Sequence, residues 1–122
     1  MRGLFDTNIL IDYLNGVEEA KKELERFSSK FISIITWMEV LVGIKDPKAL
    51  PIIKGFLKEF TLITLNDSIA DIAVQLRKQH HIKLPDAIIW ASAEQTESIL
   101  ITRNTKDFPK SLSIIHVPYT LG

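Results

Sequence analysis

The sequence contains no cysteine among its 122 residues. This absence excludes disulfide bonds and cysteine-ligated zinc, so any bound metal must take oxygen or imidazole ligands. No apolar run approaches the roughly 20 residues of a membrane-spanning helix. Because Asp6 and Asp12 interrupt the apolar start, no signal peptide is expected either. We therefore expect a cytoplasmic protein that makes no use of a membrane.

Net charge is also missing, since fifteen acidic side chains balance fifteen basic ones. Binding to a nucleic acid would then depend on a local patch and not on an overall positive field. Hydrophobic residues make up 46% of the chain, which excludes a disordered protein and provides for a core. The length fits one domain of ordinary size, so we predict a single domain over residues 1–122.

Apolar runs alternate with segments of helical periodicity. The runs predict strands at residues 2–5, 31–35, 62–65, 99–102 and 113–117. The periodic segments predict helices at residues 7–14, 18–27, 36–44, 48–60, 67–80 and 86–97. Because the strands are continuous apolar runs, they indicate a parallel sheet covered on both faces. The predicted fold class is α/β, a three-layer α/β/α sandwich around a mostly parallel five-stranded sheet.

Local signals predict how three of these helices begin. Thr36-x-x-Glu39 has the form of a capping box, and the apolar residues around the whole circumference of residues 36–44 predict a helix buried on several sides. A carboxylate on such a helix would need partners or a metal. Asn66 or Asp67 is expected to cap the helix that follows, and Pro85 to lie in the first turn of the next one.

Four acidic residues stand beside the ends of apolar runs: Asp6, Glu39, Asp86 and Asp107. Taken singly, they can be a helix cap, a capping-box partner, a favourable charge at a helix start and a turn residue. Taken together, they predict a shared site, because α/β sheets bind ligands beyond the carboxyl ends of their strands. Carboxylates suit Mg²⁺ or Mn²⁺, and two such ions about 3.5–4 Å apart could activate a water against a phosphodiester.

A basic loop follows the fourth predicted strand and contains Arg103, Lys106 and Lys110, with Lys83 as a further candidate neighbour. The loop can be a solvated surface, or it can position the phosphates of an RNA backbone beside the acids. The histidines lack the spacing of a metal site and are interpreted as structural or exposed: His80, His81 and His116.

Four segments resemble one known family in order and separation, over essentially the whole chain. They are Phe5-Asp6-Thr7-Asn8 and the stretches at residues 33–44, 84–91 and 100–108. The sequence resembles a PIN domain, of the small ribonuclease-toxin type found in VapBC toxin–antitoxin systems. The resemblance implies a five-stranded parallel sheet between helices and a divalent-metal endoribonuclease that cleaves RNA.

The resemblance also implies roles for single residues, with Asp6, Glu39 and Asp86 as metal ligands. Family members often have Asp where this chain has Asn104. Asn104 could coordinate through its carbonyl, and Asp107 could either supply the fourth carboxylate or anchor the loop. Whether the site holds one ion or two stays open. The resemblance also implies that Thr7, Asn8 and Thr102 position ligands or substrate. From the basic loop, Arg103 and Lys106 are predicted to contact the substrate.

Proteins of this type are held by a cognate VapB-type antitoxin and commonly form homodimers, which the resemblance implies here as well. Five apolar residues of the two central helices could line a shared surface: Trp37, Leu41, Ile53, Phe56 and Phe60. The alternative is that they fill the core of the monomer.

Two other functions stay open at this stage. A phosphoacceptor receiver domain has similar alternation, but it should show a second acid after the first strand and a lysine after the last. Here Asp6 is followed by Thr-Asn, and His116-Val117-Pro118 contains no lysine. A PIN-like scaffold that binds RNA or protein without cutting is the other alternative, and Asn104 is the feature that favours it.

Overall fold

The computed structural model describes residues 1–121, and a five-stranded sheet forms its centre. The strands are β1 (Arg2–Phe5), β2 (Ser29–Ser33), β3 (Thr61–Ile63), β4 (Ile99–Ile101) and β5 (Ile115–His116). Their spatial order is β3-β2-β1-β4-β5, and every neighbouring pair is parallel. The predicted α/β fold with a parallel five-stranded sheet is confirmed.

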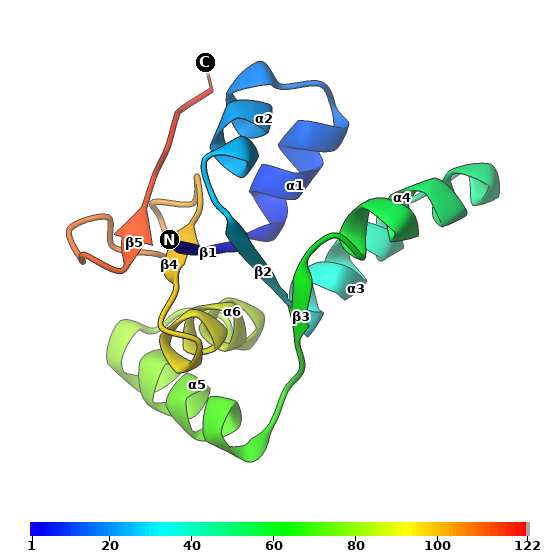
Figure 1. Ribbon diagram of the computed structural model, residues 1–122. Helices are drawn as coiled ribbons and strands as arrows, with labels where there is room; N and C mark the ends of the chain where they lie inside the picture. Colours follow the sequence, from blue (N-terminus) through cyan, green and yellow to red (C-terminus); the bar gives the residue numbers. More distant parts are fainter. Residues whose placement is uncertain (122) are drawn as a thin grey trace.

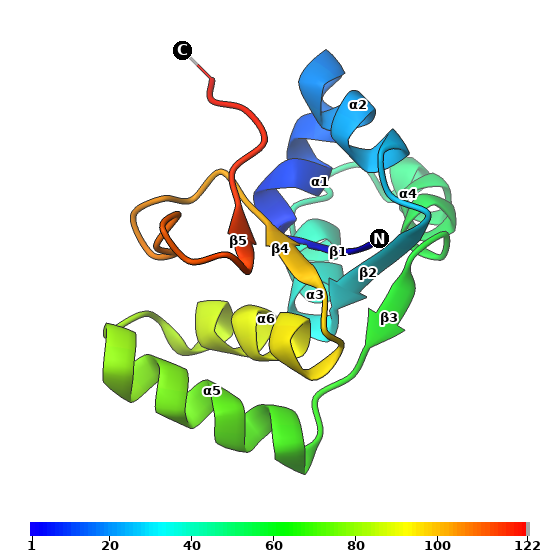
Figure 2. The same ribbon diagram turned by 60° about the vertical axis from the view of Figure 1, so that its left-hand side comes forward.

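Helices cover both faces of this sheet, and they occupy the predicted segments. They are α1 (Thr7–Leu14), α2 (Glu18–Glu25), α3 (Ile34–Val42), α4 (Leu50–Leu57), α5 (Asp67–His80) and α6 (Leu84–Gln95). Figures 1 and 2 show α5 and α6 together on one side, with α1, α2 and α4 on the other. The predicted helix at residues 48–60 is divided, because a 3₁₀ turn, η1 (Pro47–Ala49), precedes α4. Within residues 1–121, no helix combines the length and apolar composition that crossing a bilayer requires.

The continuous apolar strands are explained by two cores, one on each face of the sheet. Successive strand residues point to opposite faces. Accordingly Leu4 and Leu100 pack with α5 and α6, whereas Phe5 and Ile101 pack with α1, α2 and α4. All four side chains are fully buried. Where both faces of a strand are covered, successive residues must be apolar, as at Leu4-Phe5 and Leu100-Ile101.

The start of α3 differs from the prediction. Ser33 ends β2 and caps α3, since its hydroxyl accepts the Ile35 N–H at 3.0 Å. The strand predicted through Ile35 and the capping box at Thr36 are therefore wrong. Both Ser33 and Thr36 are good caps by residue type, and the pairing of β2 with β3, which ends at Ser33, decides between them.

The expected burial of α3 on several sides is also wrong. Thr36 and Val40 are buried, but Met38 is 47% exposed and Val42 is 85% exposed. The helix packs against α1, α4 and α6 on its inner side, and the described residues leave its outer side open. Sequence periodicity could not show this, because an apolar residue is compatible with either a core or an uncovered surface.

The apolar residues considered for a dimer surface belong mainly to the monomer. Phe60 is buried, and Trp37, Leu41, Ile53 and Phe56 pack partly buried against the core beside α1. The alternative that they fill the core is the one the structure supports. A homodimer stays a prediction, and these side chains are not its obvious surface.

Candidate active site

Asp6 lies where the direction of the sheet order reverses. The chain builds β2 and β3 on one side of β1, then crosses to place β4 and β5 on the other. Ligands of α/β sheets bind at such a switch point, beyond the carboxyl ends of the strands. Asp6 directly follows β1, caps α1 by accepting the Thr7 N–H at 2.8 Å, and is only 4% exposed.

The Asp6 carboxylate is held across the switch point by neighbouring side chains. The Thr102 hydroxyl, at the end of β4, donates to it at 2.7 Å. The Asn8 amide donates at 3.1 Å, and Asn8 in turn accepts the Arg103 N–H at 3.2 Å. One carboxylate therefore binds all three residues predicted to position ligands or substrate: Thr7, Asn8 and Thr102.

The environment of Asp6 disfavours its charged form. Burial raises the pKa of this carboxyl from 3.8 to about 6, while hydrogen bonds from Thr102 and Thr7 lower it and the charges of Asp86 and Glu39 raise it further. Desolvation and like charge both penalise an ionised carboxylate. The effect of Asp86 and Glu39 also shows that these two acids, distant in sequence, lie near Asp6.

Glu39 reaches the site from the exposed side of α3. Its carboxylate accepts a hydrogen bond of 2.6 Å from the Thr7 hydroxyl, which also lies 3.1 Å from the Thr36 hydroxyl. The expected burial of Glu39 is wrong, and it does not reach back to a cap amide. Its partner is instead a residue of α1, so Thr7 connects α1 to α3 beside Asp6.

Asp86 lies in the first turn of α6, with Pro85 before it as predicted. It is half-buried, and burial raises its pKa, followed by the charges of Asp107 and Glu39 and a hydrogen bond with Asp107, while Lys83 lowers it. Asp86 therefore lies near all of the other acids of the cluster. It interacts with Asp107 and Glu39, and also with Asp6.

Asn104 and Asp107 occupy the loop after β4 and bind each other. The Asn104 amide donates to the Asp107 carboxylate at 3.0 Å, and the Asp107 N–H donates to Asn104 Oδ1 at 3.2 Å. The Asn104 N–H donates to the Thr102 hydroxyl at 2.9 Å, which anchors the loop to the Asp6 network. Of the two candidates for the fourth acidic position, Asp107 is the one close enough to Asp86 to raise its pKa.

Arg103 does not have the environment expected of a phosphate-binding residue. Its guanidinium makes two bonds with buried Asp12, at 2.5 and 3.0 Å, and the Tyr119 hydroxyl donates to the same carboxylate at 2.8 Å. The structure thus gives Arg103 an internal partner in place of solvent. The sequence did not reveal that Asp12 binds Arg103 and Tyr119, because these residues lie 91 and 107 positions away from it along the chain. Lys106 is exposed, and its predicted substrate contact stays a prediction.

The donor chemistry of the cluster fits a hard divalent cation. Carboxylate oxygens are the ligands that Mg²⁺ and Mn²⁺ prefer, and a cation would relieve the repulsion that raises the pKa values of Asp6 and Asp86. Within residues 1–121, however, no three His, Asp or Glu side chains already converge as a set that could hold one ion. The exposed Glu39 side chain would have to turn from Thr7 to join such a set.

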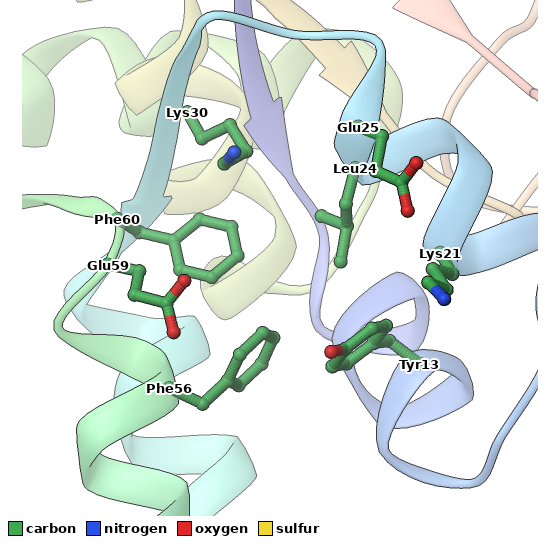
Figure 3. Close-up of a pocket in the computed structure, with 8 residues that line it drawn as sticks. All are labelled: Tyr13, Lys21, Leu24, Glu25, Lys30, Phe56, Glu59 and Phe60. Carbon is green, nitrogen blue, oxygen red and sulfur yellow. The ribbon is translucent and has the colours of Figure 1, made fainter.

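The pocket in Figure 3 is separate from the carboxylates. It lies between α1 and α2 on one side and α4 and β2 on the other, where the rings of Tyr13 and Phe56 stack at 4.8 Å. Lysines and glutamates surround this aromatic pair, and none of the predicted site residues lines the pocket. The candidate site is therefore defined by its acidic side chains and not by this pocket.

Comparison with known proteins agrees with this geometry. The family model for the PIN domain matches residues 4–110. A curated relative, Ribonuclease VapC1 of Methanocaldococcus jannaschii, is 31% identical over 112 residues, which cover 88% of this chain and 79% of that protein.

Solved structures show the same similarity. A toxin–antitoxin complex from Klebsiella pneumoniae contains a chain that is 45% identical, with a TM-score of 0.92 and coverage of 98% of this chain and 99% of that one. A chain of VapBC2 from Rickettsia felis, bound to a promoter DNA fragment, shares the fold at 22% identity, with a TM-score of 0.78 and coverage of 94% and 96%. The chain therefore belongs to the PIN-domain family and is a relative of the VapC ribonucleases.

Proposed function

We propose that this protein is a metal-dependent endoribonuclease that hydrolyses RNA phosphodiester bonds and acts as the toxin of a VapBC-type pair. One observation carries the proposal. Asp6, at the switch point of a PIN-domain sheet, is buried near other acids, and the charges of Asp86 and Glu39 add to the burial that raises its pKa; Asp107 and Glu39 act on Asp86 in the same way. Such a group is poorly suited to a purely structural role, since its members repel one another.

In this proposal the acidic residues bind the metal ion, and their hydrogen-bond partners orient them. Asp6, Glu39 and Asp86 would hold Mg²⁺ or Mn²⁺, with Asp107 as the fourth carboxylate. When bound, the ion supplies a nucleophilic water at neutral pH and stabilises negative charge on the scissile phosphate. Thr102 and Asn8 fix the orientation of Asp6 through hydrogen bonds of 2.7 and 3.1 Å.

Two further residues position the ligands indirectly in this proposal. Thr7 holds Glu39 at 2.6 Å, and a bound cation would compete with the Thr7 hydroxyl for that carboxylate. Asn104 aligns Asp107 and is not assigned as a ligand, because its Oδ1, the atom that would coordinate, accepts the Asp107 N–H. The neutral residue at position 104 is therefore compatible with catalysis.

A protein partner fits the surface as well as the family. The Klebsiella pneumoniae relative was solved as a toxin–antitoxin complex, and it is 45% identical over nearly the full length of both chains. In this chain, three apolar residues of α3 and α4 are exposed: Met38 by 47%, Val42 by 85% and Ile52 by 75%. Exposed apolar residues in this number indicate a binding surface, and we assign it to a cognate antitoxin.

The test is cleavage of end-labelled RNA by purified, antitoxin-free protein with Mg²⁺, Mn²⁺ or EDTA. Wild-type protein should cut only with a divalent ion. Asp6→Asn and Asp86→Asn should each lower the rate at least about 100-fold, more than changes in groups that only orient ligands. Asp71→Asn, an exposed acid on α5, is the matched control and should cut like wild type.

Absence of cleavage by folded protein with either ion would favour the alternative, a PIN-like scaffold that binds without cutting. Asn104 no longer supports that alternative by itself, since Asp107 supplies a carboxylate beside Asp86. Cutting that persists in Asp6→Asn would contradict the assigned site.

A further inference from the structure

Charge is segregated along the hairpin formed by α5 and α6. The two helices are antiparallel and lie side by side, so the end of α5 adjoins the start of α6 (Figure 2). Arg77, Lys78 and Lys83 lie at this junction. Asp86 of the candidate site also lies near this junction. The other acids of the hairpin lie toward its opposite end: Asp67, Asp71, Glu94 and Glu97.

The basic end is the one beside the carboxylate cluster. α6 begins at Leu84, so Lys83 and Asp86 are separated by less than one helical turn. Lys83 is also close enough to lower the pKa of Asp86. The cations therefore adjoin the reacting end of the sheet, while the acids lie away from it.

Helix dipoles explain only half of this arrangement. Cations are favoured in the last turn of a helix and anions in the first, which accounts for Arg77, Lys78 and Asp67 on α5. On α6 only Asp86 in the first turn follows the preference, whereas Lys83 at the N-cap position and Glu94 near the end oppose it. Placing like charges of two helices together is also repulsive. The segregation is thus unfavourable for the hairpin alone, which suggests a role in binding.

The surface at this junction is hollow and partly apolar. A pocket of about 560 Å³ is lined by Val74, Arg77, Lys78, His81 and Leu84. Val74 and Leu84 are 45% and 47% exposed. Arg77 donates to the Ile82 carbonyl at 2.5 Å, which fixes its guanidinium at the pocket. A held Arg77 and an exposed Lys78 beside the apolar Val74 and Leu84 suit a phosphate that carries a sugar and a base.

We infer that this basic corner, formed by Arg77, Lys78, His81 and Lys83, binds backbone phosphates of the RNA beside the scissile bond. The inference rests on the proposed nuclease function and names where the substrate lies. Charge complementarity selects a polyanion as the occupant, and phosphate contacts of this kind carry no base sequence. It also moves the main predicted phosphate contact from Arg103, which is paired with Asp12, to α5 and α6.

RNA binding without cleavage gives the direct test. Fluorescence anisotropy with two short labelled single-stranded RNAs of unrelated sequence, in EDTA and over a range of KCl concentrations, reports affinity and its salt dependence. Lys78→Ala and Lys78→Ala/Lys83→Ala should make the slope of log K against log[KCl] shallower by about 0.7 for each lysine removed, equally for both RNAs. Lys78→Arg should keep the wild-type slope.

Lys22→Ala is the matched control, because Lys22 is also an exposed lysine in the last turn of a helix, α2. It should bind RNA like wild type, and unchanged thermal melting would show that all variants fold. If the double variant binds like Lys22→Ala, or if wild type binds no RNA, the inference is overturned. An altered molar mass in light scattering with unaltered RNA binding also overturns it, in favour of a contact between copies.

Failure of the inference and of the proposed function are distinguishable. Metal-dependent cleavage with a KM that the double variant leaves unchanged overturns only the inference. No cleavage with either ion, but RNA binding that depends on Lys78 and Lys83, contradicts only the nuclease and supports the inference.

Discussion

Asn104 and Asp107 hold each other in the loop after β4, through a side-chain bond of 3.0 Å and a backbone bond of 3.2 Å in the opposite direction. These two bonds fix the Asp107 carboxylate, which we propose as the fourth acid of the site. An amide suits position 104 because it can donate to Asp107, which a carboxylate cannot do. In the proposed site, the amide at position 104 therefore orients the carboxylate of Asp107.

The first prediction concerns Asn104→Asp. The new carboxylate would lose the bond to Asp107 and repel it, so metal-dependent cleavage should fall about 10- to 100-fold, as for other residues that orient ligands. Isothermal titration with Mn²⁺ should show weaker binding. Thr105→Asp, which adds the same charge at an exposed neighbour, should have a smaller effect. Tighter Mn²⁺ binding by Asn104→Asp would instead make position 104 a ligand.

The second prediction concerns Asp12→Asn. Its carboxylate is buried and bonded to Arg103 and Tyr119, so the substitution should lower the free energy of unfolding by about 2–3 kcal/mol. This is below the range for a fully buried pair, because the Arg103 side chain is 29% exposed. Urea denaturation measures the change, and Glu19→Gln on the exposed side of α2 is the control.

Arg103→Gln extends this prediction to function. It should destabilise the protein similarly and leave the salt slope of RNA binding unaltered. A shallower slope with normal stability would restore the original interpretation of Arg103 as a phosphate contact.

The third prediction is a pH dependence of stability from Asp6. Its folded pKa, about 6, lies above the ordinary value of 3.8, so the folded state binds the proton more tightly than the unfolded state. The stability contribution of Asp6 is thus greatest below pH 3.8, falls as the pH rises to about 6, and stays low above it. The full change is on the order of 3 kcal/mol.

Urea midpoints of wild type and Asp6→Asn in EDTA, between about pH 4 and pH 7, give this change as a difference between the two proteins. The advantage of wild type should shrink with rising pH. A difference that does not vary with pH would contradict the raised pKa of Asp6.

The fourth prediction concerns metal binding in the absence of RNA. A ligand that binds only the folded state stabilises it, by about 2.7 kcal/mol at a concentration 100 times its Kd. Mg²⁺ or Mn²⁺ should therefore raise the melting temperature of wild type and have little effect on Asp86→Asn. Differential scanning fluorimetry checks both proteins, and equal shifts in the two would place the ion elsewhere.

Local patterns predicted most of the fold. The continuous apolar runs predicted a doubly covered parallel sheet, and the helix starts at Thr7 and Asp67 agree with the structure. The start of α3 was missed because Ser33 and Thr36 are equivalent caps locally. The exposure of Met38 and Val42 was missed because hydrophobicity alone does not reveal whether another element, or another protein, covers a helix face.

The sequence by itself determined the residue types of the site, because Asp6, Glu39, Asp86 and Asp107 stand at recognisable ends of strands and helices. Only the tertiary structure decided which groups meet. Thr102 reaches Asp6 across 96 residues, and Arg103 is turned to Asp12 across 91. The physical reason is that parallel pairing of β1 with β4 brings these segments together, and a hydrogen bond depends on distances in space that no spacing along the chain encodes.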